Sequence, residues 1–250
     1  MLLVVAFVIY AAICGSLYAM QRSLLYYPTP EAYSVHAQEL RIPTDGATLK
    51  VWHLPETGDK AIIYFGGNSE DVAANIDAFA VAFPNTAVYL VNYRGYGGST
   101  GEPTEKGLLT DAETVFDRVR ESHTRIAVIG RSLGSGVAVH LATVRDVSKV
   151  ALVTPFDSVA SVAQRHVAIV PVRWLLEDTF DSLDKVPQVQ APVLVLLAER
   201  DRIVPRAHSE RLVARFKPGQ ADVRSIAGTN HDSISRSPEY SAALASFLLY

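Results

Sequence analysis

A serine, an aspartate and a histidine stand in the second half of this 250-residue chain in an order that suits nucleophilic catalysis. Ser132 is the centre of the segment "GRSLG", which follows the apolar run "IAVI" and precedes a run typical of a helix. A serine hydroxyl is a weak nucleophile that needs a base, itself oriented by an acid. Glycines at 130 and 134 predict a sharp strand-to-helix turn that holds Ser132 in strained backbone geometry, because a side chain at either position would collide with nearby backbone.

The base and the acid are predicted from their places after strand-like runs. His231 is the only one of the seven histidines that follows the last of these runs, "DVRSI". Asp201 follows "VLVLLA" and lies between Ser132 and His231, so the chain order is serine, acid, histidine. Five other aspartates compete for the acid: Asp157, Asp178, Asp181, Asp184 and Asp232. Asp157 is the strongest of them because it also follows an apolar run, whereas Asp232 adjoins the histidine and would not easily reach its ring.

Acyl transfer also needs N–H donors for the oxyanion that develops on the attacked carbonyl. The backbone N–H of Leu133, directly after the serine, is the first expected donor. The second is expected from "GGNSED", the glycine-rich loop after the apolar run "AIIYF", which makes either Gly67 or Asn68 the candidate. A plain Gly-Asn turn is the structural alternative for that loop.

The elements that must position these residues alternate between strand and helix. Short runs that are apolar throughout, such as "AIIYF" and "AVYLVN", are separated by segments with helical spacing, such as residues 106–122. This alternation predicts an α/β fold, with a mostly parallel central sheet and helices on both faces. A hairpin around Asp45-Gly46 precedes the alternation. Residues 155–190 interrupt it and are expected to form a small lid, whose apolar residues suit an acyl chain, membrane contact or burial against the core.

The N-terminus differs in character from the rest of the chain. Leu2 to Met20 carries no charged residue, and at ~1.5 Å per residue it would extend roughly 28 Å, close to the hydrocarbon core of a bilayer. Residues 1–21 are therefore expected to be a transmembrane helix, residues 22–39 a tether and residues 40–250 the catalytic domain. A cleaved signal peptide is the main alternative, although no basic segment precedes the apolar run. Arg22 directly after the span slightly favours a single-pass protein with a cytoplasmic domain.

Composition excludes several other functions. The net charge of −3 and the lack of a basic run with interleaved aromatics argue against a nucleic-acid partner. Cys14 is the single cysteine, so neither a disulfide framework nor a cysteine-based metal site is expected. Residues 92–103 are glycine-rich but lack the Lys-Ser/Thr ending of a phosphate-binding loop. No metal or organic cofactor is expected, and the oligomeric state stays open.

The chain resembles the α/β-hydrolase superfamily over essentially its whole length. The resemblance is carried, in order, by the segments "YFGGN", "NYRGYGGSTGEP", "GRSLGSG", "APVLVLLAERDRIVP" and "NHDS". The apolar span followed by "QRSLLYYP" is similar to the small membrane-anchored serine hydrolases of that superfamily. The resemblance implies Ser132 as nucleophile, Asp201 as acid and His231 as base. Relatives often have His-Gly-Asn where this chain has Gly66-Gly67-Asn68. Because this difference lies near the oxyanion loop, the substrates of relatives do not indicate the substrate of this chain.

The resemblance implies a serine hydrolase of small-molecule carboxylic esters or thioesters, with acyl or lipid-like substrates as in esterases, lipases and depalmitoylating thioesterases. A serine peptidase would use the same three residues, although it normally needs substrate-gating structure that a chain of this length lacks. A catalytically silent binding protein of the same fold is the alternative outside enzymes. Retention of Ser132, Asp201 and His231 argues against it.

Overall fold

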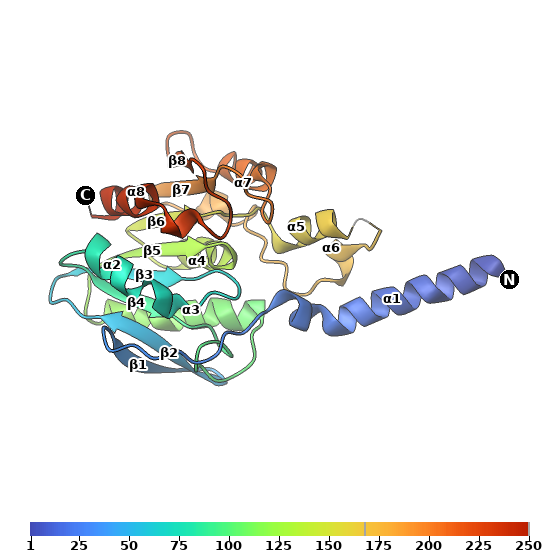
Figure 1. Cartoon of the computed structure of the whole chain (residues 1–250), viewed down its shortest axis with the longest axis horizontal. Coiled ribbons are helices and arrows are strands. Elements are labelled where there is room, and N and C mark those ends of the chain that lie inside the picture. Colours follow the sequence, from blue (N-terminus) through green and yellow to red (C-terminus); the bar gives the residue numbers. More distant parts are fainter. Residues whose placement is uncertain (168, 250) are drawn as a thin grey trace.

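The computed structural model describes residues 1–167 and 169–249, which form an α/β domain with one long helix at its N-terminus (Figure 1). The strands are β1 (Gln38–Thr44), β2 (Ala47–Leu54), β3 (Lys60–Phe65), β4 (Ala87–Val91), β5 (Arg125–Arg131), β6 (Lys149–Val153), β7 (Val193–Ala198) and β8 (Ala221–Ile226). The helices are α1 (Leu2–Leu25), α2 (Ile76–Ala82), α3 (Glu105–Arg120), α4 (Leu133–Val144), α5 (Val159–His166), α6 (Val172–Leu175), α7 (Arg206–Val213) and α8 (Pro238–Leu248). Three 3₁₀ turns complete the set: η1 (Val72–Asn75), η2 (Val186–Gln188) and η3 (Ile234–Arg236).

The eight strands form one sheet in the order β1-β2-β4-β3-β5-β6-β7-β8. β2 is antiparallel to both of its neighbours, and every pair from β4 to β8 is parallel. The predicted hairpin is therefore the β1–β2 pair, and the apolar runs are the parallel strands. This arrangement confirms the prediction of a mostly parallel α/β sheet.

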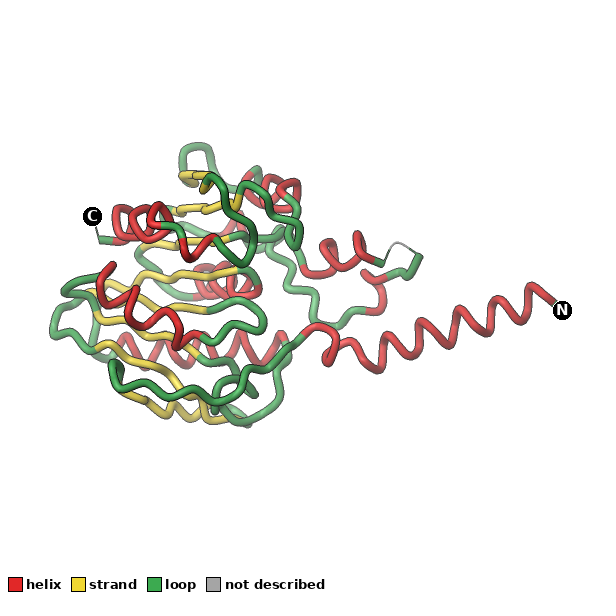
Figure 2. Tube along the Cα trace, in the orientation of Figure 1, coloured by secondary structure: helices red, strands yellow, loops and turns green. Residues whose placement is uncertain are grey.

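Helices cover both faces of the sheet, and this explains why its central strands are apolar throughout (Figure 2). Alternate residues of β3 point to opposite faces. Ala61, Ile63 and Phe65 pack into a core shared with α3, α4 and α7. Ile62 and Tyr64 pack into a second core shared with α2 and α8. A strand buried on both faces shows no polar alternation, so the run "AIIYF" follows from its place in the sheet.

The helix α1 is long and apolar enough to cross a membrane, and none of its apolar window is buried in the protein. It ends at Leu25, four residues beyond the predicted span of residues 1–21. Figure 1 shows it projecting from the domain on the side where α5 and α6 lie.

The segment after α1 is folded onto the domain, and a buried lysine holds it there. The Lys50 ammonium on β2 is fully buried and forms ion pairs with Glu31 at 2.9 Å and with Glu39 at 3.1 Å. The N–H of Gly97 donates to the carbonyl of Thr29 at 2.9 Å. The predicted tether of residues 22–39 is thus a strap bonded to the domain, although most of its side chains are exposed; its first residues belong to α1 and its last two to β1.

The insertion between β6 and β7 contains α5, α6 and η2, and its residues divide into two groups. Phe156, Phe180 and Val186 are buried in the core beneath α4. Ile169 and Trp174, in contrast, are 78% and 89% exposed. Burial in the core therefore explains the base of the predicted lid, whereas Ile169 and Trp174, near α6, lie on its surface.

Candidate active site

Ser132 lies at a strained turn between β5 and α4. Its backbone has φ 48° and ψ −115°, a region that non-glycine residues rarely occupy. A Cβ at Gly130 would overlap the Gly134 carbonyl oxygen, and a Cβ at Gly134 would overlap the Phe65 carbonyl oxygen. The two glycines therefore allow β3, β5 and α4 to approach closely enough to form the turn, as predicted from the sequence.

The structure brings Ser132, His231 and Asp201 together, although 30 and 99 residues separate the histidine from its two partners. The Nδ1 atom of His231 lies 2.8 Å from Asp201 Oδ2, and its Nε2 atom lies 2.9 Å from Ser132 Oγ. An ionised carboxylate only accepts hydrogen bonds, so the proton of the neutral imidazole belongs on Nδ1 and Nε2 can accept from the serine hydroxyl. The three side chains follow β5, β7 and β8, whose carboxyl ends meet at one edge of the sheet.

Asp201 is held in place independently of the histidine. Its Oδ1 atom accepts the N–H groups of Ile203 at 3.0 Å and Val204 at 2.8 Å, which leaves Oδ2 for His231. The rival Asp157 is also buried, but it pairs with His208 at 2.8 Å and Arg211 at 2.7 Å. Asp178 pairs with Arg22 at 3.3 Å. The geometry therefore favours Asp201 over these two rivals as the acid.

Of the predicted oxyanion donors, Leu133 and Asn68 fit the geometry and Gly67 does not. Leu133 is the first residue of α4, so its N–H has no carbonyl acceptor within the helix. The Gly67 N–H donates to Glu70 Oε2 at 2.6 Å and is thereby occupied. The Asn68 N–H has no hydrogen-bond partner within residues 1–167 and 169–249. Gly67 was therefore the wrong alternative, because a carboxylate three residues later takes its donor.

A buried ion pair between Glu70 and Arg131 supports the site, and the sequence did not single it out. Arg131 Nη1 lies 2.7 Å from Glu70 Oε2, and Arg131 Nη2 donates to the His231 carbonyl oxygen at 3.0 Å. Tyr64 donates to Glu70 Oε1 at 2.6 Å. The pair thus links the residue before Ser132, the loop of Asn68 and the loop of His231. An arginine at the buried end of an apolar strand was the available signal, since such a cation needs a carboxylate partner.

The charged state of Glu70 follows from these contacts. Burial alone would raise the pKa of the Glu70 carboxyl, but the Arg131 charge and the hydrogen bonds from Tyr64 and Gly67 outweigh burial and hold this pKa below its ordinary value. Burial alone would lower the pKa of Arg131, but the charge and hydrogen bond of Glu70, together with Tyr64 and Tyr240, outweigh burial and raise this pKa. Both groups are therefore charged at neutral pH.

We expect Arg131→Met to lower the free energy of unfolding by about 3 kcal/mol, because it leaves the Glu70 carboxylate buried without its cation. In a chain of this size, this corresponds to a melting temperature lower by roughly 10 °C, measurable by thermal unfolding in detergent micelles. The double variant Glu70→Gln with Arg131→Met is the control and should recover part of the loss. A melting temperature within 2 °C of wild type in the single variant would contradict the role of the pair.

The same pair has a defined pH dependence. Because the pKa of Glu70 is lower in the folded chain than the unfolded value of about 4.3, its contribution to stability is complete above that pH and is lost as the pH falls through the folded pKa. The difference in melting temperature between wild type and Arg131→Met should therefore narrow as the pH falls into the acid range, because Glu70 binds a proton at a higher pH in the variant than in wild type.

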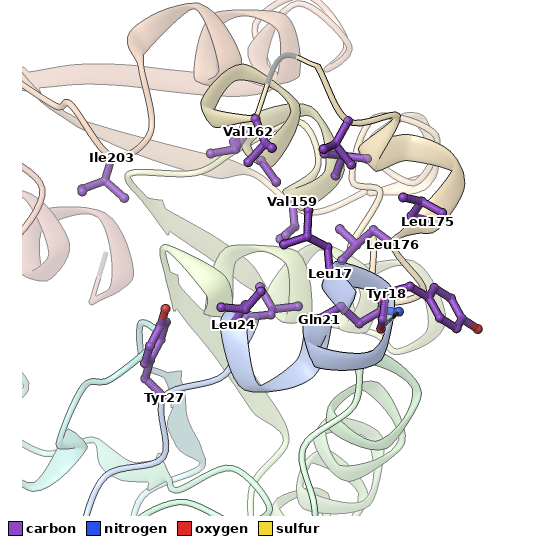
Figure 3. A pocket seen from close by; sticks show the side chains of 15 residues that line it. Leu17, Tyr18, Gln21, Leu24, Tyr27, Val159, Val162, Leu175, Leu176 and Ile203 are labelled. Atoms are coloured by element: carbon purple, nitrogen blue, oxygen red, sulfur yellow. Dashed lines mark hydrogen bonds between the residues drawn. The ribbon is translucent and has the colours of Figure 1, made fainter. Parts of the chain in front are cut away.

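Two hollows adjoin the site. One, of about 400 Å³, is lined by residues of the acid and histidine loops, including Ile203 and His231. The other, of about 690 Å³, lies between α1 and the lid, and we call it the α1–lid groove. Its walls are aliphatic except for three side chains, and it is lined by Leu17, Tyr18, Gln21, Leu24, Leu25, Tyr27, Val159, Val162, Ala163, Val167, Val170, Val172, Leu175, Leu176 and Ile203 (Figure 3).

Sequence comparison finds relatives over most of the chain. An uncharacterized protein of Mycobacterium tuberculosis is 38% identical in an alignment of 213 positions, which covers 79% of this chain and 76% of that protein. The protein ABHD12B of Homo sapiens is 30% identical in an alignment of 281 positions, which covers 89% of this chain and 78% of the relative. Alpha/beta hydrolase domain-containing protein WAV2 of Arabidopsis thaliana is 25% identical, covering 80% and 76%. No protein-family model matches the chain.

Solved structures show the same fold at lower identity. The esterase Pf2001 of Pyrococcus furiosus superposes with a TM-score of 0.73 at 20% identity, covering 90% of this chain and 98% of that chain. Est1E of Butyrivibrio proteoclasticus, solved with ferulic acid, has a TM-score of 0.70 at 19% identity, covering 84% and 98%. With its sheet order, its strand-to-helix turn at Ser132 and these relatives, the chain belongs to the α/β-hydrolase superfamily.

Proposed function

We propose that this chain is a serine hydrolase of carboxylic esters or thioesters with acyl or lipid-like substrates, and that α1 anchors it in a membrane as a single span. The esterase fold supports hydrolase activity in general. The observation that carries the finer proposal is the hydrogen-bonded series Asp201–His231–Ser132, with the serine on a strained turn. Arg22, at the end of α1, favours a cytoplasmic hydrolase domain.

The geometry suits a two-step acyl transfer. His231 Nε2 takes the hydroxyl proton while Ser132 Oγ attacks the substrate carbonyl, and Asp201 stabilises the imidazolium that forms. The N–H groups of Leu133 and Asn68 donate to the oxyanion of the tetrahedral intermediate. His231 then gives its proton to the leaving alcohol or thiol. Water attacks the acyl-enzyme by the same path and restores the serine.

A series of p-nitrophenyl esters from acetate to palmitate, with a palmitoyl thioester and a peptide anilide beside it, tests this proposal. We expect hydrolysis of esters and thioesters, with kcat/KM rising from acetate to longer chains, because the apolar groove next to the site favours methylene groups. The peptide anilide should be cleaved far more slowly. Activity on acetate alone, or preference for the anilide, would contradict the substrate class.

A further inference from the structure

The end of α1 is hydrogen-bonded to the loop that carries the second oxyanion donor. The side-chain amide of Asn68 donates to the Leu25 carbonyl oxygen at 2.5 Å, and its Oδ1 atom accepts the N–H of Tyr27 at 3.0 Å. Tyr96 donates to the same oxygen at 2.7 Å. The helix expected in the membrane is thus fixed relative to the catalytic side chains.

α1 is also attached to the lid by polar contacts along its length. Arg22 forms an ion pair with Glu177 at 2.9 Å, and the Tyr18 hydroxyl donates to the same carboxylate at 2.7 Å. Twelve residues before Arg22 in the helix, the Tyr10 hydroxyl donates to the Ile169 carbonyl oxygen at 2.9 Å. Tyr10 and Arg22 are about 18 Å apart along the axis at ~1.5 Å per residue. The lid therefore lies beside the half of α1 that leads to the domain.

The exposed apolar residues of the lid lie on this same stretch. Ile169 and Trp174 are among the most exposed apolar side chains of the domain. Trp174 adjoins the exposed Arg173, and tryptophan beside a basic residue is common at membrane–water interfaces. Exposure of such an apolar surface to water is unfavourable, whereas contact with lipid acyl chains beside a membrane-crossing helix is favourable. We therefore place the tip of the lid in the membrane, beside the stretch of α1 from Tyr10 to Arg22.

The α1–lid groove connects that membrane-facing tip with the catalytic residues. Leu175 and Tyr18 line it at one end, and Tyr27 and Ile203 at the other (Figure 3). The N–H of Tyr27 bonds to Asn68, and the N–H of Ile203 bonds to Asp201. Ile203 also lines the hollow beside His231. The inner end of the groove is thus lined by residues that bond to the oxyanion loop and to the acid loop, so the groove leads from the tip of the lid toward these two loops.

We propose that the α1–lid groove is the site for the acyl chain of a membrane lipid, and that this chain enters sideways from the bilayer between α1 and the lid. The inference rests on the proposed function and adds to it the position and the source of the acyl chain. One wall of the substrate site is then the transmembrane helix itself. The volume of about 690 Å³ lies within the ~300–1,000 Å³ typical of small-molecule sites. Each methylene buried there favours binding by about fourfold, so long chains gain most.

Binding is tested without catalysis by a diazirine-bearing palmitic acid, photolysed with the full-length chain in phosphatidylcholine vesicles and mapped by mass spectrometry. We expect saturable labelling of Val159–Ala163 on α5, which unlabelled palmitate competes away. Leu17→Trp and Val162→Trp, which fill the groove from α1 and from α5, should each reduce this labelling at least fivefold. Leu3→Trp places the same residue on α1 away from the groove and is the matched control. Labelling of α5 that is absent, not saturable or equal in all variants would overturn the inference.

Enzyme kinetics distinguish a failure of this inference from a failure of the proposed function. In the same vesicles, the ratio of kcat/KM for p-nitrophenyl palmitate to that for p-nitrophenyl butyrate should fall at least tenfold in Leu17→Trp and Val162→Trp, but not in Leu3→Trp. Ester hydrolysis with an unchanged ratio and no labelling of α5 contradicts the groove alone. Saturable labelling in a wild-type chain that hydrolyses none of these esters supports the groove and contradicts the hydrolase proposal.

Discussion

We expect Ser132→Ala to lower kcat for ester hydrolysis by roughly 10⁴- to 10⁶-fold, because it removes the hydroxyl that we propose as the nucleophile and with it the acyl-enzyme. Alanine at the same backbone position keeps the strain of the turn, so the melting temperature should change by only a few degrees. Initial rates with p-nitrophenyl butyrate, together with thermal unfolding, measure both effects.

Ser135→Ala is the matched control for that result, since it removes the second hydroxyl of the same segment. The Ser135 hydroxyl donates to the Ser132 carbonyl oxygen at 2.6 Å, so its loss costs one hydrogen bond of about 1 kcal/mol and at most about tenfold in kcat. If Ser132→Ala kept more than about a hundredth of the wild-type kcat, another group would have to be the nucleophile.

Asp201→Asn should lower kcat by about 10⁴-fold while the chain stays folded. The amide oxygen of asparagine can still accept the N–H groups of Ile203 and Val204, which turns the NH₂ group toward His231 Nδ1. That ring nitrogen must then accept, the proton moves to Nε2, and the histidine can no longer take the serine proton.

Asp157→Asn provides a close comparison, because Asp157 is more deeply buried than Asp201 and also lies 2.8 Å from a histidine nitrogen. It should destabilise the fold but leave kcat within a few-fold of wild type, because the ring of its partner His208 bonds to Asp157 and Arg211, while the nearby Ser209 hydroxyl donates to the Pro155 carbonyl oxygen. The reverse pattern, a large loss of kcat in Asp157→Asn and a small one in Asp201→Asn, would move the acid to the rival position.

Local sequence patterns predicted most of the fold. Runs such as "AIIYF" are strands because both of their faces are covered, and the three candidate catalytic residues were found because each follows such a run. Helix α1 was expected from its lack of charge, although its end at Leu25 was not, since no proline or glycine marks a stop before Pro28.

The features of the site that the sequence did not predict depend on contacts between segments that are far apart in the chain. Glu70 and Arg131 are 61 residues apart, so Arg131 at the end of an apolar strand signals the need for a carboxylate but not which carboxylate supplies it. The strap held by Lys50 and the bonds from Asn68 to α1 are of the same kind. Gly67 was retained as a donor because glycine leaves its N–H accessible, but accessibility does not show whether a carboxylate already occupies the donor.

The central claim, that Ser132 is an activated nucleophile, is tested most directly by labelling the full-length protein with a fluorophosphonate and mapping the adduct by mass spectrometry. The expected result is a single adduct on Ser132, absent in Ser132→Ala, strongly slowed in Asp201→Asn and retained in Ser135→Ala. A folded wild-type protein that stays unlabelled at Ser132, or that is labelled on another serine, would contradict the account.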